Sequence, residues 1–280
     1  MPTFTPRGLL KSAGLSFAPL LAALTGTLAG QNEADQVEVI RVQLPIKDLP
    51  AGLDGFKLLQ MSDFHLYPFT QPELVRSAVQ LCNQLKPDLI ALTGDYVWLQ
   101  PEASFELAEI LSGLDARHGV YAVLGNHDYW EGIDTVLAGF NRHRLPVLIN
   151  QGFPISTRSG GLYIAGMDDG WSGQPDLEAA LESAPSKDPV VLLYHEPDLA
   201  ERISQDGRVS LQLSGHSHGG QVRIPGLGGF ILPHLGRRYD YHLYRLGRMW
   251  LYTNGGMGTI SIPVRYGCPP EITEFILVRE

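Results

Sequence analysis

Cysteine is nearly absent from this chain of 280 residues, which contains only Cys82 and Cys268. At most one disulfide can therefore form within it. Cys82 lies in an apolar pattern of helical spacing, and we interpret it as a small buried hydrophobic residue. A bridge between the two cysteines is the alternative outside the cytoplasm, although nothing in the sequence favours it.

Positive charge is also scarce, because 21 Lys and Arg residues stand against 30 Asp and Glu residues, a net charge of −9. Proteins that coat nucleic acid usually carry a basic face, so this balance argues against a nucleic-acid partner. No internal repeat or low-complexity tract divides the chain. With 44% hydrophobic residues, the chain can bury one large core, and we expect residues 33–280 to form a single domain.

The positive charge that is present gathers near the C-terminus. Between Arg223 and Arg265 there are six arginines and one acidic residue, which gives this segment +5 and leaves −14 for the rest. Guanidinium groups match phosphate oxygens, so Arg237, Arg238 and Arg265 are candidates to bind a substrate phosphate; surface ion pairs are the alternative. Interleaved aromatic residues could stack on a base or sugar, although we expect at least two of them to pack in the core: Tyr239, Tyr241, Tyr244 and Trp250.

The first 32 residues differ in composition from the rest. Arg7 and Lys11 precede residues 12–32, which carry no charge and are rich in leucine and alanine. A basic start and an apolar run predict a signal peptide, and the uncharged length approaches the roughly 20 residues of a membrane anchor. Residues 1–32 are thus predicted to be a signal peptide or membrane anchor. The protein would be exported or attached to the outer face of the membrane, with association at the cytoplasmic face as the alternative.

Short apolar runs alternate with helical patterns in the first half of the chain. Strands are predicted over 37–42, 56–62, 88–93 and 120–124, and helices over 72–85 and 103–114. This β-α-β-α-β order indicates a parallel sheet with helical crossovers. Later strands are predicted over 162–165, 190–194, 211–213, 222–224, 249–253 and 272–278. Strands outnumber helices there, so we expect a second sheet packed on the first.

Five of the apolar runs are followed by residues with metal-binding chemistry. They are Asp63-Phe64-His65, Gly94-Asp95, Gly125-Asn126-His127-Asp128, His195 and Gly215-His216-Ser217-His218. Parallel strands deliver the residues that follow them to the carboxyl edge of the sheet, where open α/β sheets bind ligands. Read together, the five motifs predict one two-metal site. Taken alone, Asp95 would be interpreted as a turn or helix cap, and His195 as a structural histidine.

The spacing within the motifs adds detail. Asp63 and His65 are two positions apart, so in an extended segment their side chains point to one face and can bind one ion. Asn126 is a neutral oxygen donor, whereas the adjacent His127 is expected to face the substrate. Gly125 is expected to permit a tight turn at the strand end.

In this order, the five motifs resemble those of the calcineurin-like metallophosphoesterase family, and the resemblance spans roughly residues 56–280. The segments 215–221, 237–239 and 263–271 are similar to the exported or membrane-associated phosphodiesterase branch, which includes enzymes that cleave UDP-diacylglucosamine. The resemblance implies an α/β fold with two packed mixed β-sheets flanked by helices, a four-layer sandwich with the metal site at the strand carboxyl ends. Residues 33–280 would form this domain.

The resemblance also implies a role for each motif residue. One metal would be bound by Asp63, His65, Asp95 and His218, and the other by Asp95, Asn126, His195 and His216. Two divalent ions of manganese, iron or zinc suit these nitrogen and oxygen ligands better than calcium does. A hydroxide generated there would attack phosphorus, and His127 would stabilise the developing charge or protonate the leaving oxygen.

The expected function is metal-dependent hydrolysis of a phosphodiester or pyrophosphate, with a small-molecule or lipid-linked nucleotide such as UDP-diacylglucosamine as substrate. Trp98 and Trp130 follow ligand motifs and would wall the crevice, which favours an apolar group. A broad phosphomonoesterase or a nuclease is the alternative. A non-catalytic scaffold with the same fold is less favoured, because no ligand of the pattern is missing.

Overall fold

The computed structural model describes residues 32–157 and 160–280, so residues 1–31 of the predicted signal peptide or anchor lie outside the described part. In chain order the elements are β1 Glu38–Ile46, η1 Ala51–Leu53, β2 Lys57–Met61, α2 Pro72–Leu85, β3 Leu89–Thr93, α3 Ala103–Leu111, β4 Val120–Val123, α4 Asn126–Arg142, β5 Gln151–Thr157, β6 Gly160–Gly166, α5 Leu177–Ala180, β7 Val190–Leu193, η2 Pro197–Leu199, α6 Ala200–Ser204, β8 Val209–Ser214, η3 His218–Gly220, β9 Arg223–Ile224, β10 Gly228–Gly229, β11 His242–Leu246, β12 Met249–Thr253 and β13 Glu271–Arg279. Among the described helices, none has the length and apolar character to span a bilayer.

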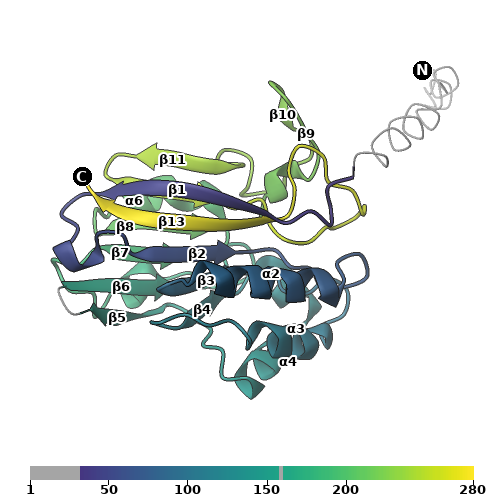
Figure 1. Cartoon of the computed structure of the whole chain (residues 1–280), viewed down its shortest axis with the longest axis horizontal. Coiled ribbons are helices and arrows are strands. Elements are labelled where there is room, and N and C mark those ends of the chain that lie inside the picture. The colour runs from purple at the N-terminus through teal and green to yellow at the C-terminus, as the bar shows by residue number, and fades with distance from the viewer. Residues whose placement is uncertain (1–31, 158–159) are drawn as a thin grey trace, which may run out of the picture. The chain divides into compact units, whose positions relative to one another are not determined.

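Two mixed sheets form the centre of the fold (Figure 1). The first has the strand order β1-β13-β2-β3-β4, in which only β13 and β2 are antiparallel neighbours. The second has the order β11-β12-β8-β7-β6-β5, parallel in the middle and antiparallel at both edges. β1 and β13 lie side by side although they come from opposite ends of the described chain, with Glu38 opposite Glu271.

Alternate residues of the central strands face different cores, and this creates four layers. In β3, Ile90 and Leu92 pack with residues of α2, α3 and α4, whereas Leu89 faces the second sheet. In β7, Val191 belongs to the core between the sheets and Leu192 packs toward α5 and α6. Strands buried on both faces explain the continuous apolar runs in the sequence. The predicted four-layer α/β sandwich is confirmed.

Several predicted boundaries differ from the observed ones. The helix predicted over 103–114 is α3, which ends at Leu111. The strand predicted over 222–224 has two residues and pairs only with β10. The sequence did not predict α4, because this helix begins inside a ligand motif and Gly132, with φ of 145°, interrupts its periodicity. β5 and β11 were also missed.

Candidate metal centre

The carboxyl ends of five parallel strands bring all seven predicted metal ligands to one edge of the sandwich. Asp63 and His65 follow β2, Asp95 follows β3, Asn126 begins α4 directly after β4, His195 follows β7, and His216 and His218 follow β8. Every one of these residues is buried, with at most 4% of its surface exposed. Residues from distant parts of the chain therefore share one solvent-shielded site.

The ligand atoms form two groups that share Asp95. One group is Asp63, His65, Asp95 and His218, the other is Asp95, His195 and His216, and within each the atoms lie within 4.8 Å of one another. His65 Nε2 is 2.9 Å from His218 Nε2 and 3.4 Å from Asp95 Oδ2. His195 Nε2 is 3.2 Å from the same Oδ2 atom. The first group has the members of the first predicted set, and the second has those of the other set except Asn126; Asp95 is common to both.

The outward-facing ring nitrogens show how three of the histidines are oriented. Backbone carbonyls lie 3.3 Å from His65 Nδ1, 2.6 Å from His195 Nδ1 and 2.6 Å from His216 Nε2. A nitrogen that donates to such a carbonyl leaves the opposite nitrogen as a lone-pair donor toward the site, as in known metal centres. The imidazoles are thus arranged for ligation.

Asn126 supplies an independent test of whether a cation fits. Its side-chain Oδ1 is buried and has no hydrogen-bond partner within the described residues. A buried amide oxygen without a partner is costly, and a divalent cation would satisfy it. The donor set of imidazole nitrogens, carboxylates and one amide therefore fits two divalent ions.

Burial dominates the electrostatics of the centre. It raises the pKa of Asp63 to about 7, and it lowers the pKa of His65 to about 3 and that of His216 to about 4. Burial also opposes the charges of Asp95 and His195, but their mutual attraction holds the pKa of Asp95 well below its usual range and that of His195 well above. The neutral imidazoles of His65 and His216 and the ionised carboxylate of Asp95 are forms that bind cations, whereas His195 would release its proton when a cation binds.

Most of the ligands have a left-handed backbone. The φ angles are 52° for Asp63, 43° for His65, 56° for Asp95, 72° for His216 and 53° for His218. Such conformations cost about 1–3 kcal/mol each and persist where the surroundings fix them. The prediction that Asp63 and His65 lie in an extended segment is therefore wrong. Their loop is held instead by backbone hydrogen bonds, Asp63 N to Gly94 O at 2.9 Å and His65 N to Asp95 O at 3.1 Å.

Two motif glycines lie where a larger side chain would clash with a ligand carboxylate. Gly125 has φ of −116°, so the prediction that it permits a tight turn is wrong. A Cβ atom there would lie 2.3 Å from Asp95 Oδ1, and one at Gly215 would lie 2.2 Å from Asp63 Oδ2. Both glycines allow the backbone to approach a ligand carboxylate more closely than any side chain would permit.

Asp128, the last residue of its motif, has a structural role that the sequence did not reveal. Its buried carboxylate accepts hydrogen bonds from the backbone N–H groups of Asp95 at 3.0 Å, Tyr96 at 2.8 Å and Gly125 at 2.9 Å. Burial, followed by repulsion from Asp95, raises its pKa to about 8. Asp128 therefore ties the loop after β3 to the loop after β4.

His127 differs from the ligands in its exposure. Its side chain is 15% exposed, and Nδ1 lies 3.7 Å from Glu131 Oε1. Its ring stands edge-on to that of His65, with centroids 4.9 Å apart, and its backbone N–H donates to Asp95 Oδ1 at 2.9 Å. His127 thus lies beside His65 and Asp95 and is more exposed than any of the ligands. Its predicted contact with the substrate stays a prediction.

Two exposed tryptophans border this opening, and we call them the tryptophan rim. Trp130 is 50% and Trp171 41% exposed, and their ring centroids are 4.9 Å apart. Trp130 lies 4.9 Å from the ring of His127, and Trp171 lies 5.9 Å from that of His216. The sequence predicted Trp130 in this place but missed Trp171, because no ligand motif adjoins it. Trp98 packs against Phe69 instead, at 5.4 Å.

The three predicted substrate arginines are not brought together. Arg265 is fully buried, and its Nη1 donates to the carbonyls of Gly255 and Cys268, both at 2.9 Å. Its Nη2 lies 3.4 Å from His218 Nδ1, so it supports a ligand from behind. Arg237 and Arg238 are exposed, and the latter pairs with Glu201. Their predicted substrate contact stays a prediction.

The remaining residues singled out in the sequence have packing roles. Tyr239 and Tyr244 pack against the core of the second sheet, and Trp250 packs against the core between the sheets, as expected for at least two of these aromatic residues. Cys82 and Cys268 are both buried and free. The Cys82 thiol lies in the core under α2, which confirms its interpretation as a small buried hydrophobic residue.

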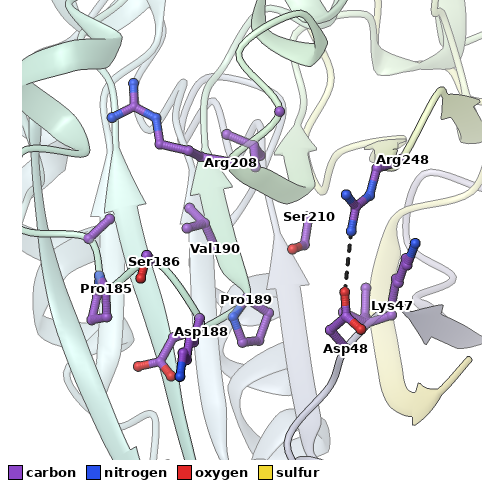
Figure 2. A pocket seen from close by; sticks show the side chains of 15 residues that line it. Lys47, Asp48, Pro185, Ser186, Asp188, Pro189, Val190, Arg208, Ser210 and Arg248 are labelled. Carbon is purple, nitrogen blue, oxygen red and sulfur yellow. Dashed lines mark hydrogen bonds and ion pairs between the residues drawn. The ribbon is translucent and has the colours of Figure 1, made fainter.

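A surface pocket of about 530 Å³ lies elsewhere on the molecule (Figure 2). Its lining includes Pro189 and Val190 at the start of β7 and Val209 at the start of β8, and the ion pair between Arg248 and Asp48 spans one side of it. These strand starts are opposite to the ends that carry the metal ligands, so the pocket is separate from the metal centre.

Comparisons with known proteins agree with this geometry. Residues 56–220 match the calcineurin-like phosphoesterase family. The chain is 34% identical to the uncharacterized metallophosphoesterase YkuE of Bacillus subtilis, over 88% of this chain and 87% of that protein. It is 35% identical to phosphodiesterase YaeI of Escherichia coli, over 80% and 82%.

Two further relatives extend the comparison. A transmembrane protein with metallophosphoesterase domain from Danio rerio is 30% identical over 93% of this chain, which spans only 62% of that protein. The sulfate thiohydrolase SoxB of Thermus thermophilus is similar in fold alone, with a TM-score of 0.51 and 15% identity over 73% of this chain and 52% of that one. The chain belongs to the calcineurin-like phosphoesterase family and is a metal-dependent phosphoesterase.

Proposed function

We propose that this phosphoesterase hydrolyses a phosphodiester or pyrophosphate bond in a lipid-linked nucleotide, of which UDP-diacylglucosamine is an example. The tryptophan rim carries the proposal, because Trp130 and Trp171 are half-exposed beside His127 and His216. Exposed aromatic rings at the mouth of a polar site favour a substrate with a base or an apolar group to stack or pack on them. The name of the Escherichia coli relative, a phosphodiesterase, supports the bond type.

Different residues of the chain would have different roles in the hydrolysis. Two divalent cations of manganese, iron or zinc, held by the two ligand groups, would supply Lewis-acid stabilisation of the phosphoryl oxygens. His127, with Glu131 Oε1 3.7 Å from its Nδ1, would give a proton to the leaving oxygen. The left-handed ligand loops and Asp128 fix the positions of the ligands before substrate binds.

The location of the enzyme is part of the proposal. Residues 1–32 read as a signal peptide or membrane anchor, and relatives from Danio rerio and Bos taurus are named transmembrane proteins. We place the enzyme at the outer face of the membrane, where a lipid-linked substrate would be within reach. Small-molecule or lipid-linked phosphoesters are its expected partners, and nucleic acid is not.

A substrate panel tests the proposed function. The metal-loaded full chain is assayed side by side with a phosphomonoester, a chromogenic phosphodiester, single-stranded DNA and UDP-diacylglucosamine. We expect the highest kcat/KM for the lipid-linked pyrophosphate, with measurable turnover of the chromogenic diester. A clear preference for the monoester or for DNA would reject the proposed substrate class while leaving the phosphoesterase assignment intact.

A further inference from the structure

The hairpin of β9 and β10 and the two residues after it expose several large apolar side chains. Within the described residues, ten large hydrophobic side chains are exposed, and four of them lie within eight positions of each other: Ile224 at 39%, Leu227 at 72%, Phe230 at 63% and Ile231 at 82%. The segment 224–233 that contains them carries no charged residue. We call this segment the apolar hairpin. Exposed apolar side chains this close together in the chain indicate an interaction surface.

The apolar hairpin is a defined structure and not a loose loop. Leu227 N donates to Ile224 O at 2.9 Å and closes the turn, and the positive φ of Gly226, 81°, fits this bend. β9 and β10 pair in the register Ile224 opposite Gly228 and project beyond the two sheets (Figure 1). The chain therefore holds these side chains outward at a fixed place.

Both ends of the apolar hairpin are attached to the metal centre. Before it, Arg223 Nη1 donates to the carbonyl of Gly219, next to the ligand His218, at 2.8 Å. After it, the carbonyl of His234 accepts a hydrogen bond from the ligand His216 at 2.6 Å. The His234 ring also lies 5.2 Å from that of Trp171. Whatever surface the hairpin enters is thus brought next to the ligands and the tryptophan rim.

The charges around the apolar hairpin favour an anionic surface. The segment 222–239 contains three arginines and no carboxylate. Arg223 and Arg238 pair with acidic residues, but Arg237 is exposed and forms no ion pair with the carboxylates of the described residues. Its Nε lies 3.4 Å from the carbonyl of Leu232, so its charge stands at the base of the hairpin. Asp198 also lies at the base, where its carboxylate accepts hydrogen bonds from the backbone N–H groups of Arg237 and Arg238, both at 2.9 Å. The exposed guanidinium of Arg237 is thus the cation beside the apolar tip, and an apolar tip next to a cation is an arrangement that binds anionic lipid interfaces.

We propose that the apolar hairpin inserts into the surface of an anionic lipid bilayer and holds the metal centre against it. The hairpin is a second contact, separate from residues 1–32, and it does not depend on hydrolysis. Insertion would let a phosphoester in the headgroup layer reach the ligands without leaving the bilayer. The proposal can therefore fail while the proposed function holds, and the reverse is also true.

A fluorescent label at the tip tests the proposal in the metal-loaded full chain. The substitution Leu227→Cys introduces an accessible thiol, because the two native cysteines are both 0% exposed. The same label on Phe153→Cys is the matched control, since Phe153 is 45% exposed on β5. Ile231→Cys provides a second tip position. All three variants keep residues 1–32, so any binding through that segment acts on each equally.

Each outcome of the experiment decides the proposal. With vesicles containing phosphatidylglycerol, emission from the tip labels should shift to the blue and be quenched by nitroxide on the acyl chains, with a smaller shift on pure phosphatidylcholine and none at residue 153. No shift at the tip, or equal shifts at tip and control, would overturn it. If the tip labels already emit further to the blue than the label on residue 153 when no vesicles are present, the tip would contact a second copy or residues 1–31. A shift with monomeric short-chain phosphatidylglycerol would assign it to a single lipid; both results would overturn bilayer insertion.

Discussion

The interior of the metal centre and its rim are held in different ways. The seven predicted ligands are at most 4% exposed, and backbone hydrogen bonds and the carboxylate of Asp128 fix their loops. Trp130 and Trp171 at the rim are 50% and 41% exposed; their rings contact each other, and Trp130 Nε1 donates to Ser172 Oγ at 2.8 Å. The left-handed ligands of the interior are held by these contacts. Under the proposed function, the interior would determine the reaction and the tryptophan rim would determine the substrate.

The largest effect should follow from a change in the interior. Asp95 is the one carboxylate that belongs to both ligand groups, so Asp95→Asn should lower hydrolysis of a chromogenic phosphodiester by more than about 10³-fold and reduce bound metal. Asparagine tolerates the φ of 56° at this position, so the fold should persist.

The matched control is Asp88→Asn, which precedes the opposite end of β3. Its activity should equal that of the wild type, and circular dichroism should show both variants folded. Full turnover in Asp95→Asn would contradict the assignment of the shared ligand and would remove the distinction between interior and rim.

His127 lies between the two regions, and its substitution should have a smaller effect. His127→Ala should retain metal, because His127 belongs to neither ligand group, and should lose on the order of 10²-fold in kcat for a substrate with an alkoxide leaving group. With a nitrophenolate leaving group, which needs no proton, the loss should shrink. An equal loss for both leaving groups would argue against proton donation. His143→Ala, at the other end of the same helix, serves as the control.

The sequence predicted the interior far better than the rim. Apolar runs and the polar residues after them were sufficient to place Asp63, Asp95 and His195 at one edge, because the carboxyl ends of parallel strands all lie at the same edge of a sheet. The backbone of these residues was not predictable, since left-handed angles arise from contacts between loops distant in sequence. Trp171 lies on a loop without a motif, and only the folded chain shows which ring it meets.

Arg265 shows a further limit of prediction from the sequence. Its charge and its arginine-rich surroundings suggested a substrate phosphate, yet the folded chain buries it behind His218 with backbone carbonyls as acceptors. Charge in a sequence indicates what a side chain can bind, whereas burial decides whether a ligand reaches it. The buried ligands could be predicted more safely, because five motifs in a fixed order and spacing had to be explained together, whereas Arg265 was judged by its charge and neighbours alone.

The smallest predicted effect sharpens the comparison at the rim. Trp171→Ala should raise KM about 2- to 10-fold for a substrate with a nucleobase or acyl chain, the loss expected for one aromatic contact, and leave kcat nearly unchanged. A small alkyl phosphodiester, which has neither a ring nor an acyl chain to pack on Trp171, should show no change in either constant. Phe153→Ala removes a similarly exposed ring, 45% against 41%, from an edge strand and should change neither substrate. If instead Trp171→Ala lowered kcat for both substrates, its contact with His216 at 5.9 Å would be the cause, and Trp171 would belong to the interior.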